Sequence, residues 1–201
     1  FVNLSMDTDD YVNPVKTSAF SIDMLVNKHY KLDEDFVPDD LVEFDRKYCN
    51  DEVQEGNREA VVAFKNMYEA AKKEGLGLVI NSSYRSYQDQ ENICNTFKDL
   101  YGEGYVTKYV ALPGFSEHQT GLAFDIGSTS SKVFAESKEY EWMKENAYKY
   151  GFISRFTKAN AYITGFRSEP WHYRYVGKKV AKYIYDNNIS LEEYYAEFLD
   201  N

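Results

Sequence analysis

The sequence predicts a single α+β domain built on a small antiparallel sheet. Its 201 residues, 43 % of them hydrophobic, suffice for one proper core. Helical and strand patterns mix along the chain without the strict alternation of βαβ units, and no internal repeat is visible. No segment has the biased composition of a disordered tract. We therefore expect one fold in which most residues are ordered.

The N-terminal part of the chain has the weakest pattern. Residues 1–56 lack sustained periodicity and predict an irregular wrap that belongs to the same unit as residues 57–201. Within the wrap, short extended pieces are expected at 25–28 and 36–38.

A clear amphipathic helix is predicted where the wrap ends. Asn57 is a suitable N-cap, and apolar residues then recur at helical spacing over residues 58–74. Gly75 provides the stop.

The rest of the chain carries two kinds of pattern. Short aliphatic or aromatic runs predict strands at residues 76–82, 122–126, 152–153, 161–163 and 171–176. Apolar residues at helical spacing predict helices at residues 87–100, 138–150, 178–187 and 191–199. Gly151 ends the second of these helices, and Ser190 with Glu193 caps the last. Between the first two helices a glycine-rich loop is expected through Gly102, Gly104 and Gly114.

The charge of the chain excludes some classes of partner. A formal net charge of -10 leaves no basic surface for nucleic acid or for an anionic membrane. The acidic residues concentrated between 33 and 59 are expected to form a solvated face, because their spacing fits no calcium loop. No apolar run is long enough to span a bilayer, and no signal segment opens the chain. We therefore expect a soluble monomer, with removal of a signal or anchor left as an open alternative.

Two cysteines, Cys49 and Cys94, cannot form a structural zinc site by themselves. They are expected to form either a disulfide or two inert thiols. Thiols are favoured, because a domain of this size does not need a covalent staple.

Two of the three histidines occur in polar segments beside predicted strands. His118 precedes the strand that carries Asp125, and His172 lies on another strand. A catalytic zinc ion takes three ligands from His, Asp or Glu and leaves its fourth position for water, so this set matches. Simpler alternatives stay open: a histidine is often a hydrogen-bonded filler, and Asp125 can cap a turn. His29 has no comparable partners and is expected to be structural or exposed.

Glu169 strengthens the metal hypothesis. It lies three residues before His172, and the following Pro170 biases its backbone toward an extended conformation. A carboxylate there is close enough to act as base for a water on the metal, although a surface carboxylate is the simpler alternative. Three aromatic residues that alternate with polar neighbours are expected to pack in the core: Trp171, Tyr173 and Tyr175.

Longer blocks of sequence carry a more specific signal. They are Tyr84-Arg85-Ser86-Tyr87 with Gln90, the block from Pro113 to Ile126, Tyr150-Gly151-Phe152-Ile153, Ile163-Thr164-Gly165, and the block from Glu169 to Gly177. Occurring in this order, these blocks resemble the VanY-type D-alanyl-D-alanine carboxypeptidase family of zinc peptidases. The resemblance covers roughly residues 22–199, whereas residues 1–21 match nothing recognisable.

The resemblance implies a fold and a set of roles. The fold would be an α+β domain with a zinc cleft on one face of an antiparallel sheet, as in lysostaphin-type peptidases and hedgehog domains, with residues 57–201 as the peptidase domain. His118, Asp125 and His172 match the metal ligands, Glu169 the catalytic base, and Arg85 the arginine that steadies the reacting carbonyl. Residues that match or adjoin the family's substrate pocket are Ser116, Gln90 and Ser86.

The function expected from the resemblance is removal of the C-terminal D-alanine from peptidoglycan stem peptides, with a D,D-carboxypeptidase preferred. An L,D-carboxypeptidase acting on tetrapeptide stems and a related wall endopeptidase or dipeptidase remain alternatives. A metal-binding module without catalysis is disfavoured, because Glu169 and Arg85 would have no purpose in it. A wall substrate implies action outside the cytoplasm.

Overall fold

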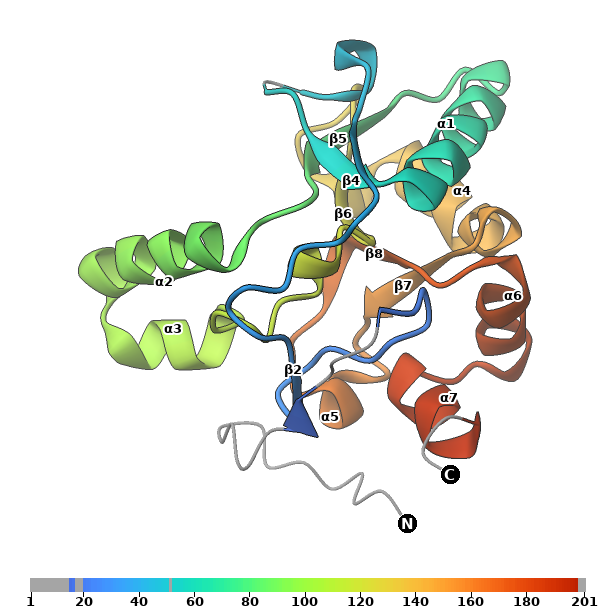
Figure 1. Cartoon of the computed structure of the whole chain (residues 1–201). Helices are drawn as coiled ribbons and strands as arrows, with labels where there is room; N and C mark the ends of the chain where they lie inside the picture. Colours follow the sequence, from blue (N-terminus) through green and yellow to red (C-terminus); the bar gives the residue numbers. More distant parts are fainter. Residues whose placement is uncertain (1–14, 17–19, 51, 199–201) are drawn as a thin grey trace.

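A four-stranded sheet forms the centre of the structure, a computed structural model that describes residues 15–16, 20–50 and 52–198 (Figure 1). Its strand order is β5 (Leu78–Ser82), β6 (Ala123–Ser128), β8 (Glu169–Tyr175), β7 (Phe152–Phe156). Every neighbouring pair in this sheet is antiparallel. The predicted α+β class with a small antiparallel sheet is confirmed.

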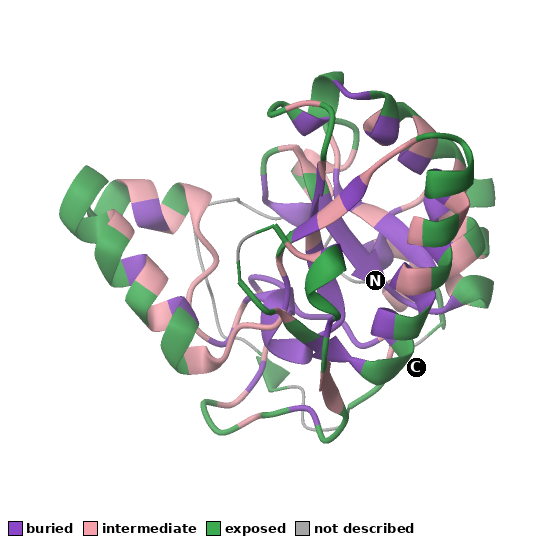
Figure 2. Ribbon diagram, turned by 90° about the horizontal axis from the view of Figure 1, so that it is seen from above, coloured by how far each residue is buried: buried purple, intermediate pink, exposed green. Residues whose placement is uncertain are grey.

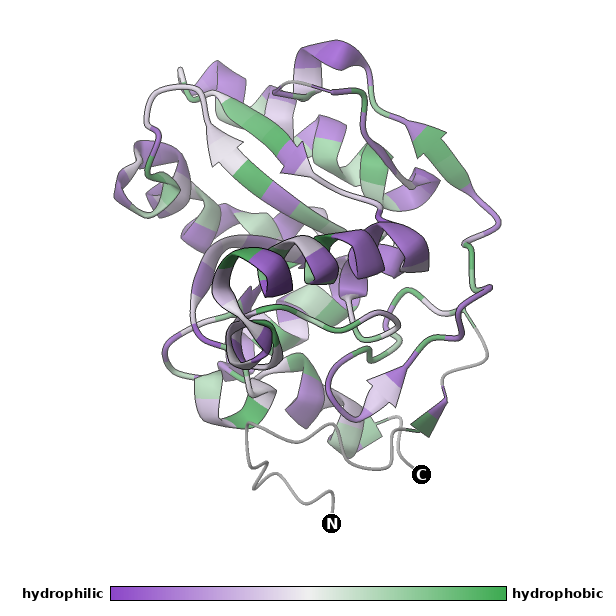
Figure 3. Cartoon of the chain, turned by 90° about the vertical axis from the view of Figure 1, so that its left-hand side faces the viewer, coloured by the Kyte–Doolittle hydropathy of each residue, from purple (hydrophilic) through white to green (hydrophobic). Residues whose placement is uncertain are grey.

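Helices surround the sheet on several sides (Figure 1). They are α1 (Arg58–Lys73), α2 (Tyr87–Tyr101), α3 (Glu103–Tyr109), α4 (Lys138–Asn146), α5 (Ala161–Thr164), α6 (Lys178–Asn187) and α7 (Leu191–Phe198). Short 3₁₀ segments are η1 (Arg46–Tyr48), η2 (Glu117–Thr120), η3 (Phe134–Glu136) and η4 (Ala147–Tyr150). Figure 2 shows the sheet strands largely buried, whereas the α2–α3 hairpin projects from the body with a more exposed surface. The helices alternate hydrophobic and hydrophilic residues along their length (Figure 3).

The N-terminal region contributes short strands to the same body. β1 (Val15–Lys16) pairs in parallel with β2 (Tyr30–Lys31), and β3 (Leu41–Glu43) pairs with β4 (Glu55–Asn57). Neither extended piece expected at 25–28 and 36–38 is part of a strand: residues 36–38 form neither helix nor turn, but the chain bends from residue 27 to residue 29, so the first piece is interrupted. Asn27 explains this interruption, because its side-chain oxygen accepts from the backbone N–H groups of His29 and Tyr30 and bends the chain there. Residues 1–14, 17–19 and 51 of the predicted wrap, like residue 199 of the last predicted helix, lie outside the described residues.

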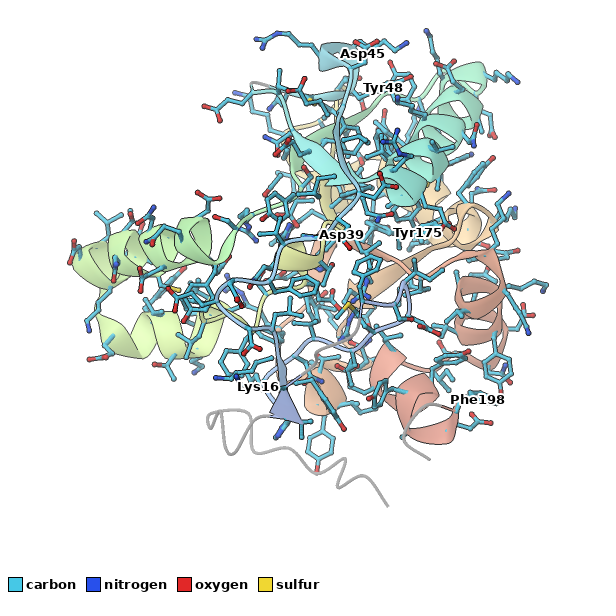
Figure 4. All side chains as sticks on the ribbon, viewed as in Figure 1. Lys16, Asp39, Asp45, Tyr48, Tyr175 and Phe198 are labelled. Carbon is cyan, nitrogen blue, oxygen red and sulfur yellow. The ribbon has the colours of Figure 1, made fainter. Side chains whose placement is uncertain are left out.

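Helix α1 follows its prediction closely. The Asn57 side chain accepts from the backbone N–H groups of Glu59 and Ala60 and so caps the helix. The apolar face of α1 packs on the sheet, where its members are almost fully buried. Tyr175 of β8, labelled in Figure 4, lies below α1 in that view. Its hydroxyl donates to Glu59 Oε1 at 2.7 Å and so ties the helix to the sheet.

Two predicted elements are wrong. The expected glycine-rich loop contains helix α3, which begins after Gly102, where φ is +86°. Ring contacts between Phe97 and Tyr105 and between Tyr101 and Tyr105 hold α3 against α2. The expected strand at residues 161–163 is the short helix α5. Asn160 accepts from the N–H of Thr157 and donates to a backbone carbonyl, which turns the chain before α5.

The register of β6 and β8 divides the sheet into two faces. Phe124 and Tyr173 are partners, are fully buried, and belong to the main core with α1 and α4. Asp125 and His172 form the next pair, and because successive residues of a strand point to opposite faces, both project from the other side of the sheet. The fold therefore brings two candidate ligands together on one face.

Both cysteines of the chain, Cys49 and Cys94, are free thiols, as the sequence favoured. Among the helices of the described residues, none has both the length and the apolar composition needed to span a bilayer.

Candidate active site

The three predicted ligands converge on the face of the sheet opposite the main core. His118, Asp125 and His172 each offer one ligand atom, and these atoms lie within 4.8 Å of one another. Asp125 Oδ1 lies 3.4 Å from His118 Nε2 and 3.2 Å from His172 Nδ1. The two imidazole rings meet edge to face, with centroids 5.0 Å apart. Such a cluster could hold one cation.

Local structure explains how His118 reaches this position. It lies in η2, whose N-cap Ser116 accepts from the His118 backbone N–H. Gly121 ends η2 with φ of +68°, and a side chain at this position would collide with Leu41 and with the backbone N of Asn57. The chain therefore turns tightly from the histidine into β6.

Each ring has one nitrogen in a polar contact on its far side, which leaves the other nitrogen facing the cluster. His118 Nδ1 lies 2.6 Å from the carbonyl oxygen of Ser83, which can only accept, so Nδ1 carries the proton and Nε2 faces Asp125. His172 Nε2 lies 3.0 Å from Glu117 Oε2, so its Nδ1 faces Asp125. Both rings thus present an unprotonated nitrogen when neutral, which is the form that binds metals.

The donor set fits a divalent cation. Asp125 Oδ1 is buried and has no hydrogen-bond partner among the described residues, although two ring nitrogens face it. A buried acceptor without a partner is costly, and a cation shared with the two imidazoles removes that cost. Two histidines and one carboxylate form a typical set for catalytic zinc.

The electrostatics of the cluster favour positive charge. Burial opposes ionisation of Asp125, but the two imidazoles hold the pKa of its carboxyl well below the ordinary value. Burial also favours the neutral ring of His172, but Asp125 and Glu117 raise the pKa of that imidazole to about 9. Burial, together with the nearby Arg85 guanidinium, lowers the pKa of His118. The negative charges of Asp125 and Glu117 therefore favour a positive charge beside them, which either a proton or a divalent cation can supply.

Glu169 and Arg85 lie at the edge of the cluster. Glu169 Oε2 is 4.0 Å from His172 Nδ1, and burial raises the pKa of the Glu169 carboxyl. Burial lowers the pKa of Arg85, while Asp125 and Glu169 favour its charge. The buried Nε of Arg85 has no hydrogen-bond partner within the described chain, so it can donate to a bound molecule.

The three predicted pocket residues differ in what they offer. Ser116 lines the cleft, and its hydroxyl proton has no acceptor among the described groups. Gln90 also lines the cleft, but its Nε2 already donates to the Ala111 carbonyl at 2.7 Å, which leaves Oε1 as a buried acceptor with no hydrogen-bond partner in the described part of the chain. In this orientation Gln90 offers a bound molecule an acceptor rather than a donor. Ser86 lies outside the lining, because its side chain forms the capping box of α2 with Asp89.

The cluster opens into a cleft of about 270 Å³ whose opposite wall is the α2–α3 hairpin. Phe97 of α2 and Tyr105 and Tyr109 of α3 give this wall aromatic character. Trp171 also lines the cleft and is 38 % exposed, so the expectation that it packs in the core is wrong. Tyr173 does pack in the core, where it has no exposed surface.

Comparison with known proteins is consistent with this geometry. The family model of VanY, described as D-alanyl-D-alanine carboxypeptidase, matches residues 54–178. The putative carboxypeptidase YodJ of Bacillus subtilis is 47 % identical over 85 % of this chain. The chain spans 66 % of the length of YodJ and about half of the length of other curated relatives.

Two solved structures resemble the chain over most of its length. The LD-carboxypeptidase LdcB, whose structure concerns peptidoglycan recognition, has a TM-score of 0.79 and 46 % identity, covering 86 % of this chain and 84 % of that one. The vancomycin resistance D,D-pentapeptidase VanY from a VanB-type cassette, a mutant in complex with Zn(II), has a TM-score of 0.71 and 31 % identity, covering 86 % and 97 %. These likenesses confirm the predicted peptidase fold.

Proposed function

Since this chain belongs to the VanY family of D-alanyl-D-alanine carboxypeptidases, we propose that it is a zinc carboxypeptidase that releases the C-terminal D-alanine of peptidoglycan stem peptides. One observation carries the proposal: two imidazoles and one carboxylate converge in a cleft that also contains Glu169 and Arg85. A site that only stored or bound a metal would need neither of these two residues.

His118, Asp125 and His172 would hold the zinc ion, each through the atom that faces the cluster. Zinc bound there would act as a Lewis acid that lowers the pKa of a water molecule and polarises the peptide carbonyl. Aspartate and neutral histidine are suitable ligands for it.

Glu169 is the proposed general base. Its carboxylate lies beside the ligand cluster and can accept a proton from the attacking water. Burial raises the pKa of this carboxyl, which makes the carboxylate a stronger base toward the proton of the water. The same group can then return the proton to the leaving amine.

Arg85 is the proposed donor to the carbonyl oxygen of the reacting peptide. Its Nε has no hydrogen-bond partner among residues 15–16, 20–50 and 52–198, so a new hydrogen bond to a developing negative charge costs little reorganisation. The hydroxyl of Ser116 is a suitable donor to the terminal carboxylate of the substrate. Gln90 Oε1 is a suitable acceptor for an N–H group of the substrate.

Arg85→Ala is expected to lower kcat by about 100-fold or more, with a smaller effect on KM, because the hydrogen bond strengthens as charge develops. Arg85→Lys should restore only part of the loss, since lysine lacks the planar fork. Arg58→Ala removes an exposed arginine outside the cleft, one that pairs with Asp40, and serves as the control whose kcat should equal that of the wild type. Steady-state kinetics separate the two constants, and a change in KM alone would make Arg85 a ground-state anchor instead.

Within the substrate class, we propose the pentapeptide ending in D-Ala-D-Ala as the preferred substrate and a site of action outside the cytoplasm, where the wall lies. The family assignment supports the D,D bond. A tetrapeptide with an L,D bond is the second candidate, because the LD-carboxypeptidase LdcB shares 46 % identity with this chain.

The substrate test compares penta- and tetrapeptide stems, each as free acid and as C-terminal amide, with the products identified by mass. We expect each free acid to lose a single alanine, and the pentapeptide to lose it faster. Both amides should be cleaved poorly, because an amide leaves unpaired the protein donors that would bind the terminal carboxylate. Faster cleavage of the tetrapeptide would reassign the enzyme to the L,D class. Equal cleavage of acids and amides, or internal fragments alone, would indicate an endopeptidase.

A further inference from the structure

Glu117 is a buried carboxylate that neither the metal ligands nor the catalytic pair account for. Its side chain is 2 % exposed, and Oε2 lies 3.0 Å from His172 Nε2. The other oxygen, Oε1, accepts from Arg155 Nε at 2.7 Å and from Arg174 Nη1 at 3.0 Å. Both oxygens are therefore engaged, and each has a distinct kind of partner.

Groups from distant parts of the chain fix this carboxylate in place. Arg155 also donates to both oxygens of Glu192 in α7, at 2.8 and 2.6 Å. Arg174 also donates to the carbonyl oxygen of Met24 at 2.8 Å. The two arginines and two glutamates balance in charge, which makes their burial tolerable. Glu117 cannot turn away from His172 without breaking this arrangement.

We propose that Glu117 is a positioning residue that selects the ring nitrogen with which His172 binds the metal. An ionised carboxylate accepts hydrogen bonds and donates none, so it requires the proton on His172 Nε2. The lone pair of Nδ1 then points toward Asp125, 3.2 Å away. Phe156 packs against the ring at a centroid distance of 4.8 Å and limits other orientations.

The variant Glu117→Gln tests this directly, because it keeps the shape of the side chain and makes one of its two terminal atoms a donor. The amide oxygen should take the place of Oε1, which accepts from both arginines, because charged donors form the stronger hydrogen bonds. The amide NH₂ must then face His172 Nε2 and favours a proton on Nδ1, the nitrogen that should bind the metal. Zinc affinity is expected to fall about 10- to 100-fold.

Glu192→Gln is the matched control. It removes a carboxylate that is equally buried and pairs with the same arginine, but does not touch His172. Zinc dissociation constants measured by chelator competition should change little in this variant, even if thermal denaturation shows that both variants lose similar stability. Equal loss of zinc affinity in the two variants, or none in Glu117→Gln, would reduce Glu117 to a structural ion pair.

A second measurement uses only the wild-type protein, so it does not depend on whether a variant folds. In the zinc-loaded wild-type protein, a proton–nitrogen correlation spectrum of the imidazole rings should show metal on His172 Nδ1 and the proton on Nε2. The opposite assignment overturns the inference. The inference rests on the proposed zinc site, but the two fail differently: wild-type protein without zinc or peptidase activity rejects the function, whereas an active zinc enzyme indifferent to Glu117→Gln rejects only this step.

Discussion

Replacing Glu169 by Gln is expected to keep one zinc ion per chain and to lower kcat by about 100- to 10,000-fold, the range typical of a lost general base. The amide has nearly the same shape as the carboxylate but cannot accept a proton from water. Because Glu169 lies 4.0 Å from His172 Nδ1 and is not one of the three converging ligands, zinc binding should survive. Elemental analysis and steady-state kinetics on the same preparation measure both quantities.

The control for this prediction is Glu141→Gln, which removes an exposed carboxylate of α4 that pairs with Lys144. Its kcat should equal that of the wild type. If Glu169→Gln retains activity within a few-fold of wild type, Glu169 has no part in proton transfer and another base must be sought.

Replacing His172 by Ala is expected to abolish stoichiometric zinc binding and, with it, peptidase activity. The variant removes one of three ligands and leaves two, fewer than catalytic zinc sites use. The domain should still fold, because the main core lies on the other face of the sheet and Glu117 keeps both arginine partners.

Thermal denaturation with and without zinc measures this effect independently of activity. Zinc that binds the native state should raise the Tm of the wild type, with a gain of about 4 kcal/mol when zinc exceeds its dissociation constant 1,000-fold. His172→Ala should show no such shift. His29→Ala removes the histidine outside the cluster and should respond to zinc like the wild type. An unchanged zinc response in His172→Ala would place the metal elsewhere.

Local patterns predicted the elements that local interactions determine. Asn57 caps α1, Gly151 ends η4 in a left-handed conformation, and Ser190 with Glu193 caps α7, as expected from side chains within a few residues of each helix end. Helices α3 and α5 were missed. The first depends on ring contacts with another helix, and the second on side-chain hydrogen bonds within a turn.

The candidate site likewise contains residues that the sequence indicates and residues that only the fold brings together. Zinc chemistry restricted the residue types, and the blocks that resemble the VanY family singled out His118, Asp125 and His172. The Asp125–His172 register then places two of them side by side. Glu117 was missed as a functional residue although it adjoins His118. Its role depends on Arg155 and Arg174, which come from β7 and β8, and no local pattern indicates that these three charges meet in the interior.

The most direct test of the account is a single reaction followed by mass spectrometry. The protein is stripped of metal with a chelator, dialysed, and incubated with a pentapeptide stem ending in D-Ala-D-Ala, with or without one equivalent of zinc. We predict that zinc restores the loss of one C-terminal alanine and that the metal-free protein leaves the peptide intact. Equal cleavage without zinc, or no loss of alanine with one zinc ion bound per chain, would contradict the assignment as a zinc D,D-carboxypeptidase.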